Sequence, residues 1–187
     1  RKITEHPDID VVSICSYDDN HAGQAISAFE NGKHVMIEKP VALNRMDAER
    51  ILRAQQDSGK LITSNLILRR SPRFVEIRDM VQSGTFGEIF HIEGDYLHQI
   101  LWKFTEGWRG KMNFASTFYS GGIHLVDLIR WIMGTEIREV CAVGNNIMTR
   151  GSNYGYPDTI TSLMEFEGGA TAKCTAMVGP QRTKFHS

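Results

Sequence analysis

Residues 34–44 read HVMIEKPVALN, and this stretch decides the fold because an apolar run stops abruptly at charged residues. The three apolar residues Val35, Met36 and Ile37 have the character of a buried strand. Glu38 and Lys39 follow at once, and Pro40 has no backbone N–H with which to continue a sheet. The stretch therefore predicts a strand that ends in a polar loop, after which Asn44 is suited to cap a helix.

The segments on both sides of this stretch repeat the same alternation. Residues 10–16, DVVSICS, form a continuous apolar run, which is typical of a strand buried on both faces. Apolar residues at helical spacing follow until Gly32, and a second helical pattern runs from Asn44 to Gly59. Residues 61–68 then predict a third strand. Strands and helices that alternate at this short spacing predict parallel strands joined by right-handed crossovers.

The pattern changes in the second half of the chain. Residues 71–84 predict a helix whose buried stripe consists of Phe74, Ile77 and Val81. Residues 90–96 alternate as a strand does, and residues 158–177 predict a hairpin with its turn at Gly168 and Gly169. Residues 121–133 predict a helix that is apolar nearly all round and therefore central. The second half is thus expected to be α+β, and the whole chain α/β.

Composition excludes several classes of partner. The 187 residues include 21 basic and 22 acidic side chains, and the pI is about 6.7, so no overall charge attracts nucleic acid or an anionic membrane. Cys15, Cys141 and Cys174 are widely spaced, which argues against a disulfide scaffold or a structural zinc site and favours a cytoplasmic location. No apolar run approaches the length of a membrane span.

Lys39 is the first candidate for chemistry. Ligands of open parallel sheets bind beyond the carboxyl ends of the strands, where Lys39 is expected. Pro40 restricts the backbone of the lysine before it, and we expect the bond between them to be trans. An ammonium fixed in such a crevice can stabilise negative charge on a substrate oxygen. The alternative is a solvated lysine that follows a strand.

His124 is the second candidate. Asp127 lies three residues further along the predicted helix, on the same face, so its carboxylate could orient the imidazole. The other ring nitrogen would then exchange a proton with substrate. The alternative is a structural histidine of the core.

Other groupings carry less weight. His91, Glu93 and Asp95 share one face of a strand, but a solvated or subunit-facing strand is the better interpretation, and we predict no metal site. Four aromatic residues between 102 and 114 could stack on bases, yet no basic stripe accompanies them, so we expect no nucleic-acid partner. No GxGxxG occurs in the chain.

Five segments together resemble one family, the Gfo/Idh/MocA oxidoreductases. They are IDVVSICSYDDNHAGQAISAFENGKHVMIEKPVALN (9–44), LRRSPRF (68–74) followed by SGTFGEI (83–89), WR (108–109), GGIHLVDLIRWIMG (121–134) and DTITSLMEFEGGA (158–170). The resemblance implies a partial Rossmann domain over residues 1–67 and a substrate-binding and oligomerisation domain over residues 68–187. The second domain would contain a mainly antiparallel sheet that is open on one face, through which family members form dimers or tetramers.

The resemblance also implies what lies outside this sequence. Residues 10–64 would supply the fourth to sixth strands of the Rossmann sheet, whereas the glycine-rich turn and the acid that reads the ribose belong to earlier strands. The last strands of the second domain would be missing as well. Residues 10–16 would then form an exposed edge. We therefore expect this chain alone to bind NAD(H) or NADP(H) poorly.

The resemblance assigns roles residue by residue. It implies hydride transfer between NAD or NADP and a sugar, polyol or related cyclic alcohol, with Lys39 and His124 as the catalytic residues. Substrate would be bound by Arg69, Trp108, Arg109, Ser120 and Asp127. The cofactor would be bound by Ser16, Tyr17, His21, Glu38, Lys39 and Pro40.

Three positions depart from the family pattern. Tyr17 replaces a proline, Ile67 stands where asparagine is frequent, and Ser120 replaces an aspartate four residues before the histidine. Serine cannot supply the charge that an aspartate would offer to an imidazolium or a hydroxyl group. This departure favours an alternative in which the chain is a non-catalytic regulator that binds cofactor or sugar with the same fold. A structural remnant without activity is a further alternative.

Overall fold

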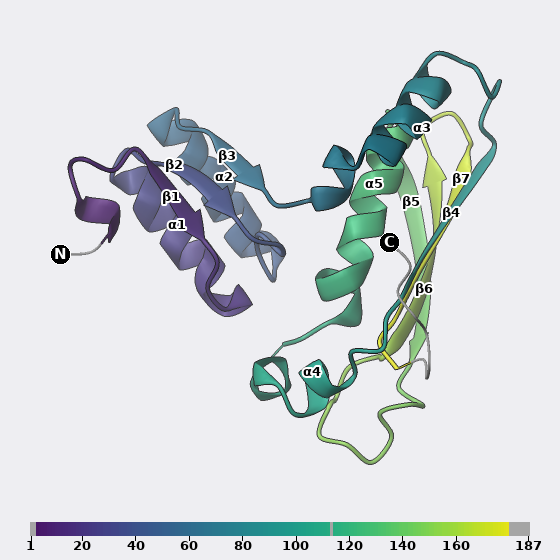
Figure 1. Cartoon of the computed structure of the whole chain (residues 1–187). Coiled ribbons are helices and arrows are strands. Elements are labelled where there is room, and N and C mark those ends of the chain that lie inside the picture. The colour runs from purple at the N-terminus through teal and green to yellow at the C-terminus, as the bar shows by residue number, and fades with distance from the viewer. Residues whose placement is uncertain (1–2, 113, 180–187) are drawn as a thin grey trace. The chain divides into compact units, whose positions relative to one another are not determined.

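A computed structural model describes residues 3–112 and 114–179, and the chain divides between Asn65 and Leu66 into two compact units (Figure 1). The first unit begins with the short helices η1 (Ile3–Glu5) and η2 (Asp18–Asn20) around its first strand. Strands and helices alternate in it as β1 (Val11–Ile14), α1 (His21–Glu30), β2 (His34–Ile37), α2 (Arg45–Ser58) and β3 (Ile62–Ser64). All the strands are parallel, in the order β1-β2-β3, which confirms the predicted alternation.

Local sequence explains the limits of α2. The Asn44 side chain accepts a hydrogen bond of 2.8 Å from the backbone N–H of Asp47, which satisfies one of the unpaired donors of the first turn. At the other end, Gly59 adopts a left-handed conformation, with φ of 64°, that stops the helix. Both ends were predicted from these residue types.

The core of the first unit lies on one face of its sheet. Ile14, Val35 and Ile37 are buried there in one cluster with residues of the two helices, including Phe29 and Ile51. On the opposite face Val11 of β1 is 59% exposed and Met36 of β2 is 42% exposed. The prediction that residues 10–16 are buried on both faces is therefore wrong, because apolar residues alone do not show how many layers cover a strand.

The third strand is shorter than predicted. β3 ends at Ser64, and the last two residues of the predicted strand, 67 and 68, begin the 3₁₀ helix η3 (Ile67–Arg70). Ser64 pairs with Ile37, the last residue of β2, and the backbone N–H of Asn65 makes the final bond to the Ile37 carbonyl. Beyond this point β2 offers no partner, so the ladder cannot continue.

The second unit combines a four-stranded sheet with helices. Its elements are α3 (Pro72–Gln82), β4 (His91–Leu97), α4 (Trp102–Thr105), η4 (Trp108–Lys111), η5 (Phe118–Gly122), α5 (Ile123–Met133), β5 (Ile137–Asn145), β6 (Thr159–Phe166) and β7 (Thr171–Met177). The strand order is β4-β7-β6-β5. Only β4 and β7 run parallel among these described strands, so the sheet is mainly antiparallel, as predicted.

α5 packs along one face of this sheet, as Figure 1 shows. Ile129 of α5 lies in a core cluster with Met164 and Phe166 of β6 and with Ala172 and Cys174 of β7. The alternate residues of these strands face away from the helix, as alternation in a strand requires. Leu163, for example, is 58% exposed, so the face opposite α5 is open in the described part of the chain.

Three expectations for this unit need correction. β5 was not predicted at all. It lies at the edge of the sheet, and its residues are half-exposed or exposed throughout. The central helix begins at Ile123 rather than at residue 121, because a π-helical turn, η5, precedes it. The predicted buried stripe of α3 is also wrong, since Ile77 is 38% exposed and no residue of α3 is buried.

Polar contacts explain how α3 is held without a buried stripe. Arg78 Nε donates to the Trp131 carbonyl at 3.1 Å, and Gln82 Nε2 donates to the Ile132 carbonyl at 2.8 Å. These carbonyls belong to the last turn of α5, where no backbone donor of the helix can reach them. α3 therefore caps α5 with its side chains. Among the residues described, no helix is long and apolar enough to cross a membrane.

Candidate active site

Lys39 follows the carboxyl end of β2, the central strand of the first unit. Lys39 is half-buried. Glu38, the residue before it, is hydrogen-bonded to residues after both neighbouring strands or at their ends. The backbone N–H of Glu38 donates to the Ile14 carbonyl at 2.9 Å, and Glu38 Oε1 accepts a hydrogen bond of 2.7 Å from Asn65 Nδ2. The loop that carries Lys39 is thus tied to the ends of both neighbouring strands, in the position that the sequence predicted.

The peptide bond between Lys39 and Pro40 is cis, which corrects the expected trans form. Pro40 is buried, and its carbonyl oxygen lies 2.7 Å from His21 Nδ1. Sequence alone could not supply this contact, because the two residues lie on different elements.

His21 links the two strand-end loops of the first unit. Its ring is fully buried, and Nε2 lies 3.2 Å from the Ser16 carbonyl while Nδ1 faces the Pro40 carbonyl. Both ring nitrogens are occupied by backbone oxygens, so the imidazole has no surface left for a ligand. His21 therefore supports the loops, whereas the sequence predicted that it contacts the cofactor.

Ser16 and Tyr17 form the loop after β1. Ser16 Oγ donates a hydrogen bond of 2.8 Å to Gln24 Oε1 of α1, and the Tyr17 side chain is 56% exposed. A cavity of about 700 Å³ runs beside this loop and along the free edge of β1, and Ser13, Ser16 and Gln24 contribute to its lining. The exposed edge predicted for residues 10–16 is therefore present, with polar groups beside it.

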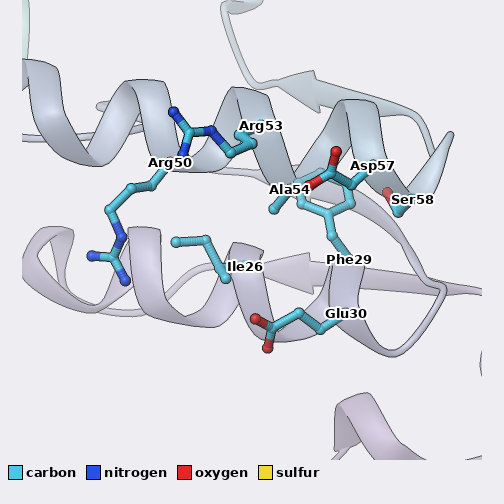
Figure 2. Close-up of a pocket in the computed structure, with 8 residues that line it drawn as sticks. All are labelled: Ile26, Phe29, Glu30, Arg50, Arg53, Ala54, Asp57 and Ser58. Atoms are coloured by element: carbon cyan, nitrogen blue, oxygen red, sulfur yellow. The ribbon is translucent and has the colours of Figure 1, made fainter.

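Figure 2 shows a second cavity of the first unit, a groove of about 490 Å³ between α1 and α2. Ile26, Phe29 and Ala54 contribute its apolar lining. Charged side chains of both signs surround it, including Glu30, Arg50, Arg53 and Asp57. Neither the strand-end loops nor Lys39 line this groove, and Arg50 is already paired with Asp47 at 3.0 Å. We therefore assign the candidate active site to the strand ends.

In the second unit, the π-helical turn η5 leads directly into the helix that carries His124. Single π-turns of this kind are frequent at functional sites. Ser120 lies in the turn, and its backbone N–H donates to the Ser116 carbonyl at 3.0 Å. His124 follows in the first turn of α5 and is half-buried. The turn therefore presents two of the predicted site residues on one short segment.

Arg69 and Asp127 form an ion pair within the second unit. Arg69 Nε donates to Asp127 Oδ2 at 2.7 Å, and Arg69 Nη2 donates to the other carboxylate oxygen. Asp127 is buried, and its carboxylate raises the pKa of the Arg69 guanidinium by hydrogen bonding and by its charge, against the opposing effect of burial. Helical spacing had suggested an interaction of Asp127 with His124 and gave no sign of this arginine partner.

Tyr96 and His98 form a hydrogen-bonded pair that the sequence prediction missed. The Tyr96 hydroxyl lies 3.0 Å from His98 Nδ1, and the rings meet edge to face with centroids 5.6 Å apart. The Tyr96 ring packs against Gly121 so closely that a side chain at Gly121 would collide with it. The sequence feature that could have identified Tyr96 is the alternation of β4. It places Tyr96 on the face opposite to His91, Glu93 and Asp95.

Trp108 and Arg109 come from η4. The Arg109 guanidinium carbon lies 4.1 Å from the centroid of the Trp108 ring, a cation–π contact that holds the arginine in place. Burial raises the pKa of the Tyr96 hydroxyl, and the charge of Arg109 opposes this rise. The charge of Arg109 therefore acts on the Tyr96 hydroxyl.

The residues considered as metal ligands are occupied by other partners. His91 contacts Thr171 at 2.8 Å and Glu93 at 3.1 Å, and Lys173 Nζ donates to Glu93 at 2.8 Å. Lys173 and His91 hold the pKa of Glu93 below its usual value. Within residues 3–112 and 114–179, no group of three histidine, cysteine or acidic side chains is placed to hold a metal ion.

These features define an α/β protein in which a parallel, Rossmann-type unit is followed by an α+β unit. Residues 1–66 match the family model described as "Oxidoreductase family, NAD-binding Rossmann fold", and residues 74–184 match the "GFO/IDH/MocA C-terminal domain". The chain belongs to the GFO/IDH/MocA oxidoreductase family, as the sequence motifs predicted.

Named relatives agree with this assignment. The chain is 31% identical over 179 residues to the oxidoreductase YrbE of Bacillus subtilis. The match covers 92% of this chain and 50% of that protein. It is 30% identical over 175 residues to levoglucosan dehydrogenase of Pseudarthrobacter phenanthrenivorans, covering 90% of this chain and 44% of the relative. The chain thus spans about half the length of the curated relatives that it matches.

A solved structure extends the comparison. Scyllo-inositol dehydrogenase of Lactobacillus casei, determined with bound NAD(H) and scyllo-inositol, superposes with a TM-score of 0.80 at 27% identity. The match covers 94% of this chain and 52% of that one. The similarity therefore extends over both units of the chain.

Proposed function

We propose that this chain is part of an NAD(P)-dependent dehydrogenase that acts on a CH–OH group of a sugar, polyol or related cyclic alcohol. The observation that carries the proposal is that both family models match in sequence order, the first on the unit that presents Lys39 and the second on the unit that presents His124. The relatives named as levoglucosan and scyllo-inositol dehydrogenases support the substrate class.

The first unit supplies residues suited to one side of a nicotinamide cofactor. Ser16, Tyr17, Glu38 and Pro40 lie in or beside the two strand-end loops, where dinucleotides bind in folds of this type. His21 joins these loops through the Ser16 and Pro40 carbonyls. When bound, the nicotinamide ring supplies the hydride acceptor or donor. The role of this unit is to bind and orient the cofactor.

Proton transfer is the task that we assign to His124. An imidazole with a pKa near neutrality can take a proton from a hydroxyl group and return it in the reverse direction. Lys39 donates a hydrogen bond to the reacting oxygen and stabilises negative charge on it. Arg69, Trp108, Arg109, Ser120 and Asp127 bind substrate, with Asp127 acting by holding the Arg69 guanidinium in place.

Turnover by the full-length protein tests the proposal. A panel of sugars and cyclic polyols is incubated with NAD and with NADP, and formation of the reduced cofactor is followed by its absorbance. Oxidation of at least one polyol supports the dehydrogenase. The neutral Ser120 in the π-turn favours a second candidate, a regulator that binds cofactor without turnover. Cofactor binding combined with no oxidation across the panel supports this regulator.

We propose that the open face of the sheet joins copies of this protein. Val143 is 70% exposed there, Leu163 is 58% exposed, and Leu163 pairs across the strands with Cys141. A cavity of about 340 Å³ lies beside Leu163 and Cys141 on β5 and β6. Val143→Lys is expected to convert a dimer or tetramer to monomers in sedimentation experiments. An unchanged oligomer would place the interface elsewhere.

A further inference from the structure

Asn65 holds the end of β2 at two successive residues. Its backbone N–H donates to the Ile37 carbonyl at 3.1 Å, and its side-chain Nδ2 donates to Glu38 Oε1 at 2.7 Å. Within residues 3–112 and 114–179, no other side chain bonds the Glu38 carboxylate. Asn65 and Glu38 are both half-buried, which strengthens this bond relative to one in water. The next residue along the chain is Lys39.

The backbone on both sides of Lys39 is held in place. Before it, the Glu38 backbone N–H donates to the Ile14 carbonyl at 2.9 Å, so β1 fixes one side of the loop and Asn65 fixes the other. After it, the Pro40 carbonyl lies 2.7 Å from Nδ1 of the fully buried His21 ring. A displacement of Glu38 would therefore be passed to Lys39, the residue between these two fixed points.

An amide is well suited to the position of Asn65. Its N–H binds a carboxylate without adding a charge, whereas a lysine or arginine would place a second cation close to the Lys39 ammonium. An ionised aspartate has no donor and would repel Glu38. Asn65 can therefore hold Glu38 without changing the charge around Lys39.

We propose that Asn65 is a positioning residue for Lys39. Its two bonds to the end of β2 keep the strand-end loop where the Lys39 ammonium reaches the reacting oxygen. The proposal rests on the proposed function, in which Lys39 stabilises negative charge on that oxygen. A small displacement of such a group is costly, because its effect depends on distance and direction.

Exchange of the donor and the acceptor tests the bond. Asn65→Asp keeps the shape of the side chain but removes its donors and places a second carboxylate beside Glu38. With saturating cofactor, kcat of the full-length protein is expected to fall about tenfold or more. Adding Glu38→Gln restores an amide–carboxylate bond with its ends exchanged. The double variant is expected to recover kcat to within about threefold of the wild type.

A Lys39→Ala background shows whether Asn65 acts through the lysine. In this background Asn65→Asp is expected to lower kcat by less than about twofold more, because the group that Asn65 positions is gone. Asn31→Asp is the matched control. It also removes an amide donor, from a bond of 2.8 Å to the Ser27 carbonyl at the exposed end of α1, and should retain the wild-type kcat.

NMR of the 187-residue chain supplies a readout that needs no turnover. The side-chain signals of Lys39 are assigned by their loss in Lys39→Ala. We expect them to shift in Asn65→Asp, to return toward their wild-type positions when Glu38→Gln is added, and to stay unchanged in Asn31→Asp.

Three results would overturn the inference. Lys39 signals that do not move in Asn65→Asp show that the bond does not position the lysine. Signals that move but do not return in the double variant show that the amide–carboxylate bond is not the cause. An equally large fall of kcat in the Lys39→Ala background shows that Asn65 acts on another group. A wild-type protein without turnover contradicts the proposed function alone, since the NMR comparison still tests the position of Lys39.

Discussion

The carboxylate of Asp127 is held by the guanidinium of Arg69 through two hydrogen bonds, one of them 2.7 Å long from Nε. The two residues lie 58 positions apart and join η3 to α5. Asp127 is one helical turn beyond His124, so the pair fixes the part of the helix on which the proposed proton-transfer residue is carried. The Arg69 side chain remains 41% exposed, which leaves the guanidinium partly accessible.

Asp127→Asn is expected to destabilise the chain. The amide cannot accept two charge-assisted hydrogen bonds from Arg69, so the free energy of unfolding should fall by about 1.5–3 kcal/mol. Urea unfolding followed by circular dichroism measures the change. Asp79→Asn, at an exposed position on α3, is the control and should change stability by less than about 0.5 kcal/mol. Equal stability of both variants would show that the ion pair does not secure α5.

Gly121→Ala is expected to disturb the π-turn. A methyl group at Gly121 would collide with the Tyr96 ring, so the ring or the turn has to move, at a cost of about 1–3 kcal/mol. The NMR signals of Tyr96 and His98 should shift as well. Gly155→Ala serves as the control, because nothing lies within 4 Å of the added methyl group there. A Gly121→Ala variant as stable as the control would contradict the packing described for Tyr96.

The three cysteines are expected to differ in reactivity. Cys174 is buried, and burial raises its pKa to about 12, so the reactive thiolate is scarce at neutral and mildly alkaline pH. Cys15 and Cys141 are exposed. A thiol reagent followed by mass spectrometry should modify Cys15 in the native protein, where Cys141 lies on the proposed oligomer interface, and should reach Cys174 only after unfolding. Labelling of Cys174 in the folded protein as fast as Cys15 would contradict the burial of Cys174.

Local sequence was sufficient to predict much of the fold. Asn44 and Gly59 marked the ends of α2, and apolar alternation marked β4 and the β6–β7 hairpin, because these signals depend on residues close in the chain. The end of β3 depends on its partner strand β2, which local patterns do not reveal. The same holds for the contact of Tyr96 with Gly121, which brings distant segments together. The roles of Lys39 and His124 remain predictions.

This 187-residue chain is expected to bind cofactor weakly. It contains no GxGxxG sequence, and its β1 strand has a free edge beside the cavity that Ser13, Ser16 and Gln24 help to line. The backbone donors that cradle a pyrophosphate in Rossmann folds are therefore not provided by the described residues. Calorimetry with NAD(H) and NADP(H) should show no binding at micromolar concentrations. A micromolar dissociation constant would mean that the strand-end loops suffice.

The pH–rate profile of the His124→Asn variant of the full-length protein tests the central claim most directly. If His124 transfers the proton of the substrate hydroxyl, turnover should fall by about 10²–10⁴ while cofactor binding is retained, and the limb of the profile that reports an ionisation near neutral pH should disappear. His6→Asn, at a half-exposed histidine of the first unit, is the control and should retain the rate and the profile. Unchanged turnover with an unchanged profile in the His124→Asn variant would contradict the assignment.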